Sequence, residues 1–238
     1  MKKKIILLLG ILLGIAAVCG ALYYFFVARP AMEETEAQKQ LIAQYYADKL
    51  ARYQQENEAY ADYEVDVAFL GDSLTDGCDL SVYYPQYKTA NRGIGGETTI
   101  GLEERMQVSA YDLKPKVVVM LIGGNNLYTM FENYEQILKG LQTNLPDTKV
   151  ILVSLTSMGR DWAHKNTQAA YNNVKIRLLA EQYGFAYVDV FSPLLDMQTN
   201  EIRAEYTTDG AHLTHLGYEV LRDAITPAID AALDFYDQ

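Results

Sequence analysis

The sequence predicts an α/β domain with a central parallel β-sheet and helices on both of its faces. Three observations carry this prediction: short β-branched runs recur after residue 65, segments with helical spacing separate them, and no internal repeat is present. Strands that alternate with helices form parallel sheets, because each crossover helix returns the chain to the same end of the sheet. Residues 65–238 are enough for one domain of common size.

The expected strands are short apolar runs that end in glycine or polar residues, as strands buried on both faces do. In chain order they are VDVAFLG (65–71), a weaker strand at 88–91, KVVVMLIGG (116–124), TKVILVSLT (148–156) and FAYVDVF (185–191). The expected helices lie between and after them, at about 98–108, 131–145, 166–183 and 215–234. Pro227 is expected to bend the last helix or to divide it.

The first thirty residues differ from the rest and predict a membrane anchor. Three lysines (residues 2–4) precede an uncharged run from Ile5 to Ala28. About 20 apolar residues suffice to cross a bilayer, and basic residues before the span favour a cytoplasmic N-terminus. We therefore expect a single-pass cell-membrane protein whose remaining chain is extracellular. A cleaved signal peptide, which would make the protein secreted, and lipidation of Cys19 are the alternatives.

Residues 31–64 are expected to form a helical stalk, because they contain neither glycine nor proline. A stripe with the spacing of a coiled-coil seam consists of Ile42, Tyr46, Leu50, Tyr53, Asn57 and Tyr60. Since tyrosine replaces leucine along much of it, a stalk that packs on the domain or pairs loosely is favoured over a dimerising coiled coil. A homodimer through the stalk is the alternative.

Charge and cysteine content exclude two classes of protein. Removing the four basic residues of the first thirty from the total of 20 leaves 16 basic against 31 acidic groups, a net charge of −15. A surface of this sign argues against nucleic acid as a partner. Cys78 is the single cysteine after residue 30, so a disulfide framework cannot hold the domain and its apolar core must.

Polar and glycine-rich clusters follow the expected strands. They are GDSL (71–74), NRGIGGET (91–98), GGNN (123–126) and, before the last helix, DGAH (209–212). In an open parallel sheet, ligands bind at the carboxyl ends of the strands. We therefore expect a serine, glycine-rich backbone, a side-chain amide and an Asp-x-x-His pair to converge on one edge of the sheet.

These groups are what acyl transfer by a serine requires. Ser73 is the candidate nucleophile and His212 the candidate base, because a hydroxyl is a weak nucleophile until a base removes its proton. Asp209 would orient the His212 ring and stabilise the imidazolium. The backbone N–H groups of Ser73 and Gly96 and the Asn125 side chain would donate to the oxyanion.

Each signal also has a plainer interpretation. Gly-Asp-Ser forms turns, glycine permits positive φ, asparagine caps helices, and a histidine can be structural. These interpretations do not explain together why four complementary groups follow strand ends. Asp209, His212 and His215 have a spacing that a metal could use, but no cysteine cluster or HExxH motif accompanies them, so no metal and no cofactor is expected. A binding module without chemistry is disfavoured, because every catalytic group is present.

The same segments resemble the SGNH hydrolase superfamily, also called GDSL esterases and lipases. FLGDSLTDG, NRGIGGET, IGGNN and DGAHLTHLGY are similar to its four blocks, in the right order, over nearly all of residues 65–238. The resemblance implies a three-layer, flavodoxin-like α/β/α sandwich, Ser73 as nucleophile, His212 and Asp209 completing the triad, and Gly96 and Asn125 as oxyanion donors. The family usually has Asp where this sequence has Asn126, which puts a local hydrogen bond in question.

The expected activity is hydrolysis of acetyl or short-chain acyl esters, on small molecules or glycans, by an extracytoplasmic serine esterase. No long apolar lid is present to suggest long acyl chains. Some of Tyr83, Tyr84, Tyr87 and Tyr128 are expected to line the cleft, because they follow strand ends; otherwise they are partly buried core. A lysophospholipase- or thioesterase-like lipase and an O-acyltransferase with the same triad are the alternatives.

Overall fold

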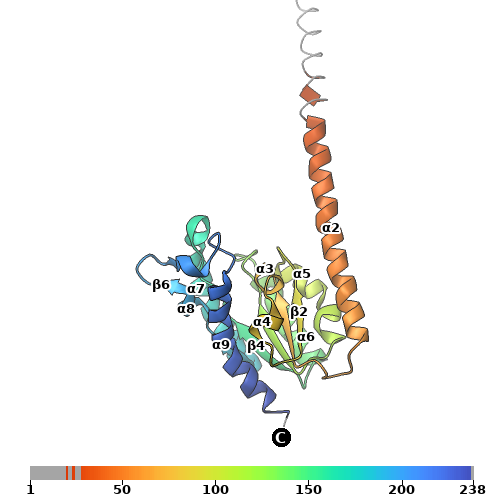
Figure 1. Ribbon diagram of the computed structural model, residues 1–238, viewed down its shortest axis with the longest axis vertical. Coiled ribbons are helices and arrows are strands. Elements are labelled where there is room, and N and C mark those ends of the chain that lie inside the picture. Colours follow the sequence, from red (N-terminus) through yellow and green to blue (C-terminus); the bar gives the residue numbers. More distant parts are fainter. Residues whose placement is uncertain (1–19, 21–22, 25–27, 237–238) are drawn as a thin grey trace, which may run out of the picture. The chain divides into compact units, whose positions relative to one another are not determined.

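Figure 1 shows the computed structural model of the protein, which describes residue 20, residues 23–24 and residues 28–236. The expected membrane span, residues 5–28, lies largely outside these residues. Among the residues that are described, no helix is both long enough and apolar enough to cross a bilayer. The chain divides into two compact units, residues 1–49 and residues 50–238, and the sheet belongs to the second.

Five parallel strands form the central sheet in the order β2-β1-β3-β4-β5. Their bounds are β1 (Val67–Gly71), β2 (Thr89–Gly93), β3 (Val117–Leu121), β4 (Lys149–Val153) and β5 (Ala186–Val188). The parallel sheet predicted from the sequence is therefore confirmed. The strand order reverses at β1, which makes the carboxyl ends of β1 and β3 the switch point where ligands bind in folds of this order.

Both faces of the sheet are buried, as successive side chains of β3 show. Val118 and Met120 belong to one apolar cluster, whereas Val117, Val119 and Leu121 belong to another. Alternate residues of a strand point to opposite faces, so the two clusters lie on opposite sides of the sheet. This double burial explains why the strands are continuous apolar runs in the sequence.

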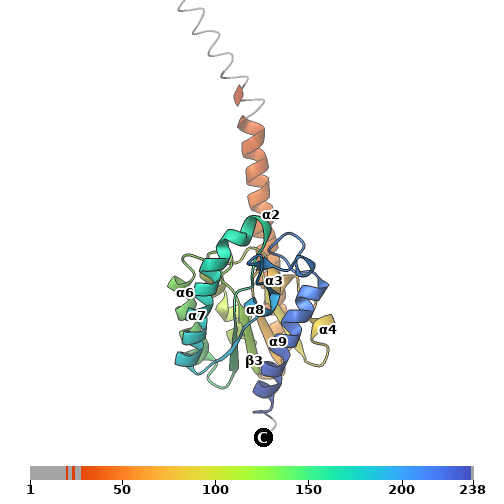
Figure 2. The same cartoon turned by 90° about the vertical axis from the view of Figure 1, so that its left-hand side faces the viewer.

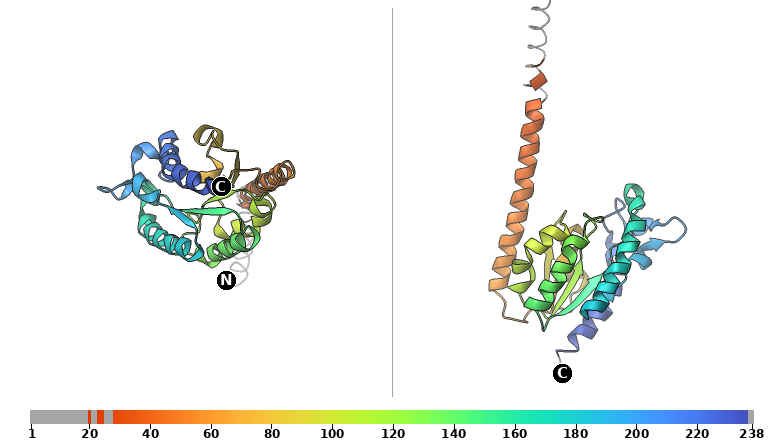
Figure 3. Two further views of the ribbon diagram at one scale, coloured as in Figure 1. Left: turned by 90° about the horizontal axis from the view of Figure 1, so that it is seen from below. Right: turned by 180° about the vertical axis from the view of Figure 1, so that it is seen from behind.

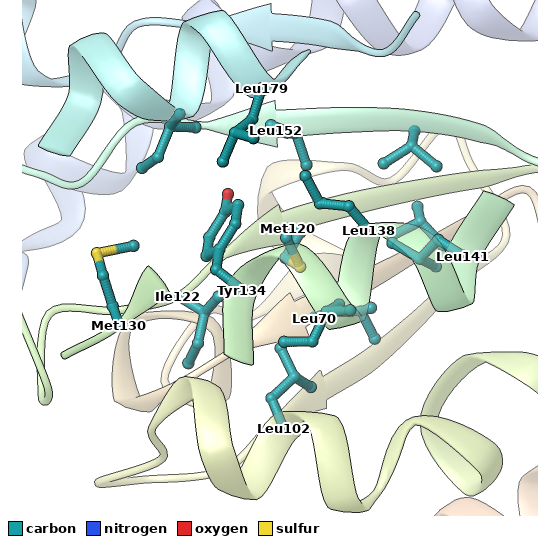
Figure 4. Close-up of a cluster of buried hydrophobic side chains, with 14 of the residues drawn as sticks. Leu70, Leu102, Met120, Ile122, Met130, Tyr134, Leu138, Leu141, Leu152 and Leu179 are labelled. Carbon is teal, nitrogen blue, oxygen red and sulfur yellow. The ribbon is translucent and has the colours of Figure 1, made fainter. Parts of the chain in front are cut away.

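Helices cover each face, which confirms the three-layer α/β/α architecture (Figure 2 and Figure 3, left). One layer consists of α5 (Thr99–Glu104), α6 (Phe131–Asn144) and α7 (Asn166–Tyr183). The other consists mainly of α4 (Leu80–Tyr83) and α9 (His215–Leu233). Figure 4 shows how the layer that contains α6 packs on the sheet: Tyr134 and Leu138 of α6 lie beside Met120 and Leu152 of the sheet.

Pro227 lies inside α9, which continues through it as one helix from His215 to Leu233. The division of this helix considered above does not occur. Proline removes one backbone donor and leaves the carbonyl four residues earlier without its partner. Pro227 is on the exposed side of α9, where solvent can satisfy that carbonyl, so the helix is not forced to end.

Several short elements were not expected from the sequence. They are α3 (Ser73–Asp76), α4 (Leu80–Tyr83), a π-helical turn (Gln107–Tyr111), the 3₁₀ helix η3 (Arg160–Lys165), α8 (Phe191–Leu194), the hairpin of β6 (Leu195–Asp196) and β7 (Glu201–Ile202), and the 3₁₀ helix η4 (Ala204–Tyr206). Segments of two to six residues contain too few positions for a periodic pattern.

The expected stalk is helical over most of its length: α2 runs from Arg29 to Glu58, whereas residues 59–64 form turns and irregular chain. Its last residues belong to the unit that contains the sheet. There Tyr53 is fully buried and donates a hydrogen bond to the carbonyl oxygen of Gly93, at 2.6 Å. The Asn57 side chain donates to the carbonyl of Val108 at 2.7 Å. These contacts fix the end of α2 beside β2.

Candidate active site

Ser73 stands at the turn between β1 and α3. Gly71 ends the strand, and a Cβ at this position would overlap Thr75 and the carbonyl of Leu121, so the turn requires glycine. Asp72 caps α3, because its side chain accepts a hydrogen bond from the backbone of Leu74 at 3.1 Å. Gly71 and Asp72 thus form a tight turn that presents the next residue, Ser73, at the switch point of the sheet.

The His212 ring joins Ser73 to Asp209. Its Nε2 lies 3.1 Å from Ser73 Oγ, and its Nδ1 lies 2.7 Å from Asp209 Oδ2. The other Asp209 oxygen accepts the backbone N–H groups of Ala211 and His212, at 2.9 and 2.8 Å. The hydrogen bond from the His212 ring, followed by these two backbone bonds, holds the pKa of Asp209 well below its ordinary value. Asp209 therefore stays a carboxylate facing the ring.

The loop that carries this pair is tied to another loop. Gly210 has φ +96°, and a Cβ there would overlap the carbonyl of Gly159. The backbone N–H of Gly159 donates to the Gly210 carbonyl at 2.8 Å. Thr207 Oγ1 accepts from the Gly210 N–H at 2.8 Å and donates to the His212 carbonyl at the same distance. Glycine at position 210 thus allows the two loops to contact one another directly.

Gly96 and Asn125 lie in the same pocket as Ser73 and His212. Gly96 has φ +77°, in the left-handed region that glycine adopts without strain. The Asn125 side chain donates to the carbonyl of Glu97 at 2.8 Å, which fixes the amide against the loop after β2. A primary amide has two N–H donors, so the second remains for a ligand in the pocket. All five predicted site residues are therefore brought together.

Asn126, where the family usually has aspartate, makes two hydrogen bonds to Thr99. Its Oδ1 accepts from the Thr99 N–H at 3.3 Å, and its Nδ2 donates to Thr99 Oγ1 at 2.8 Å. The Thr99 hydroxyl then donates to the carbonyl of Met130 at 2.9 Å. The amide thus keeps the local connection between the loop after β3 and α5.

Arg105 is a buried residue that no sequence motif indicated. It is 3% exposed and forms an ion pair with Glu97 at 2.8 Å. Its guanidinium also donates to the carbonyls of Arg92 and Gly71, at 2.9 and 3.1 Å. Arg105 therefore joins the ends of β1 and β2 to the loop that carries Gly96. The eight-residue spacing from Glu97 to Arg105 fits no common motif, so the pair gave no signal.

The pocket over these residues has a volume of about 310 Å³. Its lining consists of Asp72, Ser73, Leu74, Gly96, Gly124, Asn125, Thr156, Met158, Trp162, Lys165, Ala211 and His212. Four residues of this lining were not expected: Thr156, Met158, Trp162 and Lys165. They follow β4, whose carboxyl end is not among the polar clusters that were expected to meet.

The tyrosines expected to line the cleft do not do so, and this prediction is wrong. Tyr83 and Tyr84 are 7% and 2% exposed and pack between the sheet and α9, together with the partly buried Tyr87. Tyr128 is 72% exposed, outside the pocket. The short helix α4, which the sequence did not reveal, turns the first two rings inward. His215 is also engaged elsewhere: its Nδ1 lies 2.8 Å from the Tyr83 hydroxyl.

The family model described as "GDSL-like Lipase/Acylhydrolase family" matches residues 69–220, more than half of the chain. Among solved structures, a GDSL-like lipase of Bacteroides thetaiotaomicron is 25% identical, with a TM-score of 0.68 over 77% of this chain and 98% of that one. A Streptococcus pneumoniae protein provisionally named a platelet activating factor is 23% identical, with a TM-score of 0.74 over 83% and 99% of the two chains.

An acetyl-xylooligosaccharide esterase of Geobacillus stearothermophilus is 19% identical, with a TM-score of 0.58 over 71% of this chain and 95% of that one. At this identity the similarity shows a shared fold. None of the curated proteins is similar enough in sequence to count as a match.

Proposed function

The chain belongs to the GDSL-like lipase/acylhydrolase family, within the SGNH hydrolases, and is a carboxylic ester hydrolase; from this premise we propose that it cleaves acetyl or short-chain acyl esters through a triad of Ser73, His212 and Asp209. The observation that carries the proposal is the unbroken series of contacts from Asp209 Oδ2 through the His212 ring to Ser73 Oγ, at 2.7 and 3.1 Å. Nucleophile, base and orienting carboxylate are recognised by this geometry.

The tautomer of His212 follows from its partners. Because the Asp209 carboxylate accepts a hydrogen bond at Nδ1, the neutral ring carries its proton there and presents a lone pair at Nε2. That lone pair takes the Ser73 hydroxyl proton as Oγ bonds to the ester carbonyl carbon. The imidazolium then gives this proton to the departing alcohol as its C–O bond breaks. Water repeats the sequence on the acyl-enzyme and releases the acid.

The oxyanion formed on the carbonyl would be bound by the backbone N–H groups of Ser73 and Gly96 and by the free N–H of Asn125. The bond from Asn125 to Glu97 and the ion pair from Glu97 to Arg105 support this proposal, because both hold the donors in place before the charge develops. Donors that need not reorganise contribute most to lowering the barrier.

The size and exposure of the pocket favour short acyl esters and water as the acyl acceptor. About 310 Å³ accommodates a small ester, at the lower end of ligand pockets. The His212 side chain is 52% exposed, so water can reach the acyl-enzyme. The acetyl esterase from Geobacillus shares the fold. We further propose, from the uncharged run at residues 5–28, that the enzyme is attached to the cell membrane and acts outside the cell.

The test replaces the nucleophile. Ser73→Ala should lower kcat for 4-nitrophenyl acetate by about 10⁴-fold or more, because the remaining groups cannot form the acyl-enzyme. Ser192→Ala is a matched control, since Ser192 is exposed and outside the pocket. Initial rates and circular dichroism of both variants decide the outcome. A folded Ser73→Ala protein that keeps substantial activity would show that another group is the nucleophile.

A further inference from the structure

The loop of residues 158–166, which follows β4, forms one wall of the catalytic pocket. It includes η3 and brings Met158, Trp162 and Lys165 into the lining. None of these residues has a role in the mechanism above. Because they line the same pocket as Ser73, their chemistry bears on which esters the enzyme accepts.

Asn166 closes this loop by joining its two ends. The Asn166 side chain is 1% exposed; it accepts the backbone N–H of Met158 at 2.8 Å and donates to the Met158 carbonyl at 2.7 Å. The hydrogen bond from Gly159 to Gly210 then connects the loop to the segment that carries His212. The two ends of the loop therefore have a defined position relative to the segment that carries the catalytic base.

Lys165 is the one lysine or arginine in the lining of the pocket. Its ammonium lies 4.3 Å from the centre of the Trp162 ring, a cation–π contact that keeps the flexible side chain in place. Among the described residues, no carboxylate lies within ion-pair distance of it. In a protein with a net charge of −11, a half-buried lysine that has no acidic partner and lines the pocket of the nucleophile is available to a ligand.

The position of the loop indicates which part of the ester meets Lys165. His212 must lie beside the alcohol oxygen, because it donates a proton to that oxygen when the ester bond breaks. The 158–166 loop is bonded to the His212 segment, whereas Gly96 and Asn125 of the carbonyl side come from the loops after β2 and β3. The loop that carries Lys165 is therefore attached to the segment whose histidine contacts the alcohol portion of the substrate.

We propose that Lys165 binds an anionic group on the alcohol portion, so that the preferred substrates are acyl esters of negatively charged alcohols, carrying a carboxylate or a phosphate. This inference rests on the proposed esterase function and specifies its substrate class. An ammonium held by an aromatic ring provides a fixed positive charge for such oxygens. It also offsets the repulsion that the acidic protein exerts on an anionic ester.

The test compares two esters that differ in charge, 3-acetoxybenzoate and its neutral methyl ester. For each enzyme, the kcat/KM for the anionic ester divided by that for the neutral ester measures the preference for the anion. The two esters differ in intrinsic reactivity, but this difference is the same for every variant and cancels when the ratios of two variants are compared. We expect Lys165→Gln to lower this ratio about tenfold, the usual contribution of a charge-assisted hydrogen bond, and Lys165→Arg to retain most of it. High salt should lower the ratio of the wild type but not that of Lys165→Gln.

Lys175→Gln is the matched control. Lys175 also lies over an aromatic ring, 4.0 Å from the centre of Phe131, but outside the pocket. The Lys175→Gln variant should have the same ratio of kcat/KM values for the anionic and the neutral ester as the wild type. An unchanged ratio in Lys165→Gln would overturn the proposal, and so would a loss of the same size in Lys175→Gln, because the effect would then be one of general surface charge.

A binding measurement separates this proposal from the esterase function. In the Ser73→Ala background, 3-hydroxybenzoate should bind about ten times more weakly after Lys165→Gln, as measured by calorimetry. If the wild type hydrolysed neither ester, the proposed function would fail, yet this titration would still report on the anion site. Equal binding with and without Lys165 would refute the anion site even in an active esterase.

Discussion

At the scale of single residues, two aspartates of the pocket region have pKa values displaced in opposite directions. Hydrogen bonds from the His212 ring and two backbone N–H groups lower the pKa of Asp209. Burial raises the pKa of Asp72 to about 6, since the hydrogen bond from Leu74 and the nearby His212 offset the loss of water only in part. The exposed Asp209 is thus ionised at every pH above the ordinary aspartate pKa of about 4. Asp72, by contrast, is mostly protonated and uncharged below about pH 6.

The raised pKa of Asp72 predicts a stability that falls as pH rises. In the unfolded chain this carboxyl loses its proton near pH 4, but in the folded protein only near pH 6. Between these values the folded state binds more protons, so the free energy of unfolding decreases with pH. The loss is complete above about pH 6 and amounts to up to about 3 kcal/mol.

Asp72→Asn should remove this dependence, because asparagine caps a helix as well as aspartate does without a buried charge. The variant should be more stable than the wild type at pH 7 by about 1–3 kcal/mol. Urea unfolding at pH 4, 5, 6 and 7 measures the difference, and Asp234→Asn, at an exposed aspartate, is the control. A wild type and an Asp72→Asn protein with parallel pH profiles would contradict the assignment.

At the scale of elements, the end of α2 supports the strand that leads to the oxyanion loop. Arg92 of β2 is fully buried, and its guanidinium pairs with the Glu56 carboxylate and donates to Asn57 at 3.0 Å. The ring of Tyr53 lies 4.7 Å from this guanidinium. A buried charge is tolerated only with such partners. Residues 53–57 of the expected stalk are therefore part of the fold of the hydrolase.

Two shortened chains test this dependence. A chain that begins at Leu50 keeps every partner of Arg92 and should fold and hydrolyse 4-nitrophenyl acetate as the longer chain does. A chain that begins at Ala59 loses Tyr53, Glu56 and Asn57, and the loss of one large buried aromatic side chain such as Tyr53 typically costs about 3–5 kcal/mol. Much of the stability of an ordinary domain would then be lost. Equal unfolding midpoints of the two chains would show that α2 contributes nothing to the domain.

The sequence predicted the long elements because each one has a pattern that its burial requires. β1 and β3 are buried along their whole length and are continuous apolar runs, and α6 keeps its apolar residues on one side. The sequence could not predict α4 or η3, which are four and six residues long. The misplacement of Tyr83 and Tyr84 follows from this, since α4 determines where their rings point.

The residues of the candidate site also fall into two groups, those that the sequence predicted and those that it did not. Ser73, Gly96, Asn125, Asp209 and His212 occur in short motifs next to expected strands or helices, so the topology alone indicated that they meet. Arg105 and Lys165 lie between motifs and act through three-dimensional proximity. Arg105 reaches Gly71, which lies 34 residues away in sequence. Contacts of this kind depend on how loops and helices pack, which local patterns do not encode.

At the scale of the whole molecule, charge and the N-terminal segment bear on where the enzyme works. The net charge of −11 is repulsive to anionic esters at a distance, so Lys165 would act only once a substrate has entered the pocket. The acidic surface also disfavours binding to anionic lipid headgroups. Attachment to a membrane would therefore depend on the apolar residues 5–28 and not on the surface of the hydrolase.

The membrane proposal predicts that the full chain remains in the membrane fraction after washing with high salt and with alkaline carbonate. Such washes remove proteins held by charge, whereas an apolar segment of about 20 residues stays in the bilayer. Protease added to intact cells should digest the hydrolase, because the lysines at positions 2–4 place the N-terminus in the cytoplasm. A chain that begins at Leu50 is the control and should remain soluble when expressed in the cytoplasm. Release of the full chain by carbonate would contradict the proposal, and a shortened chain in the medium that begins near residues 21–32 would show that the segment is a cleaved signal peptide.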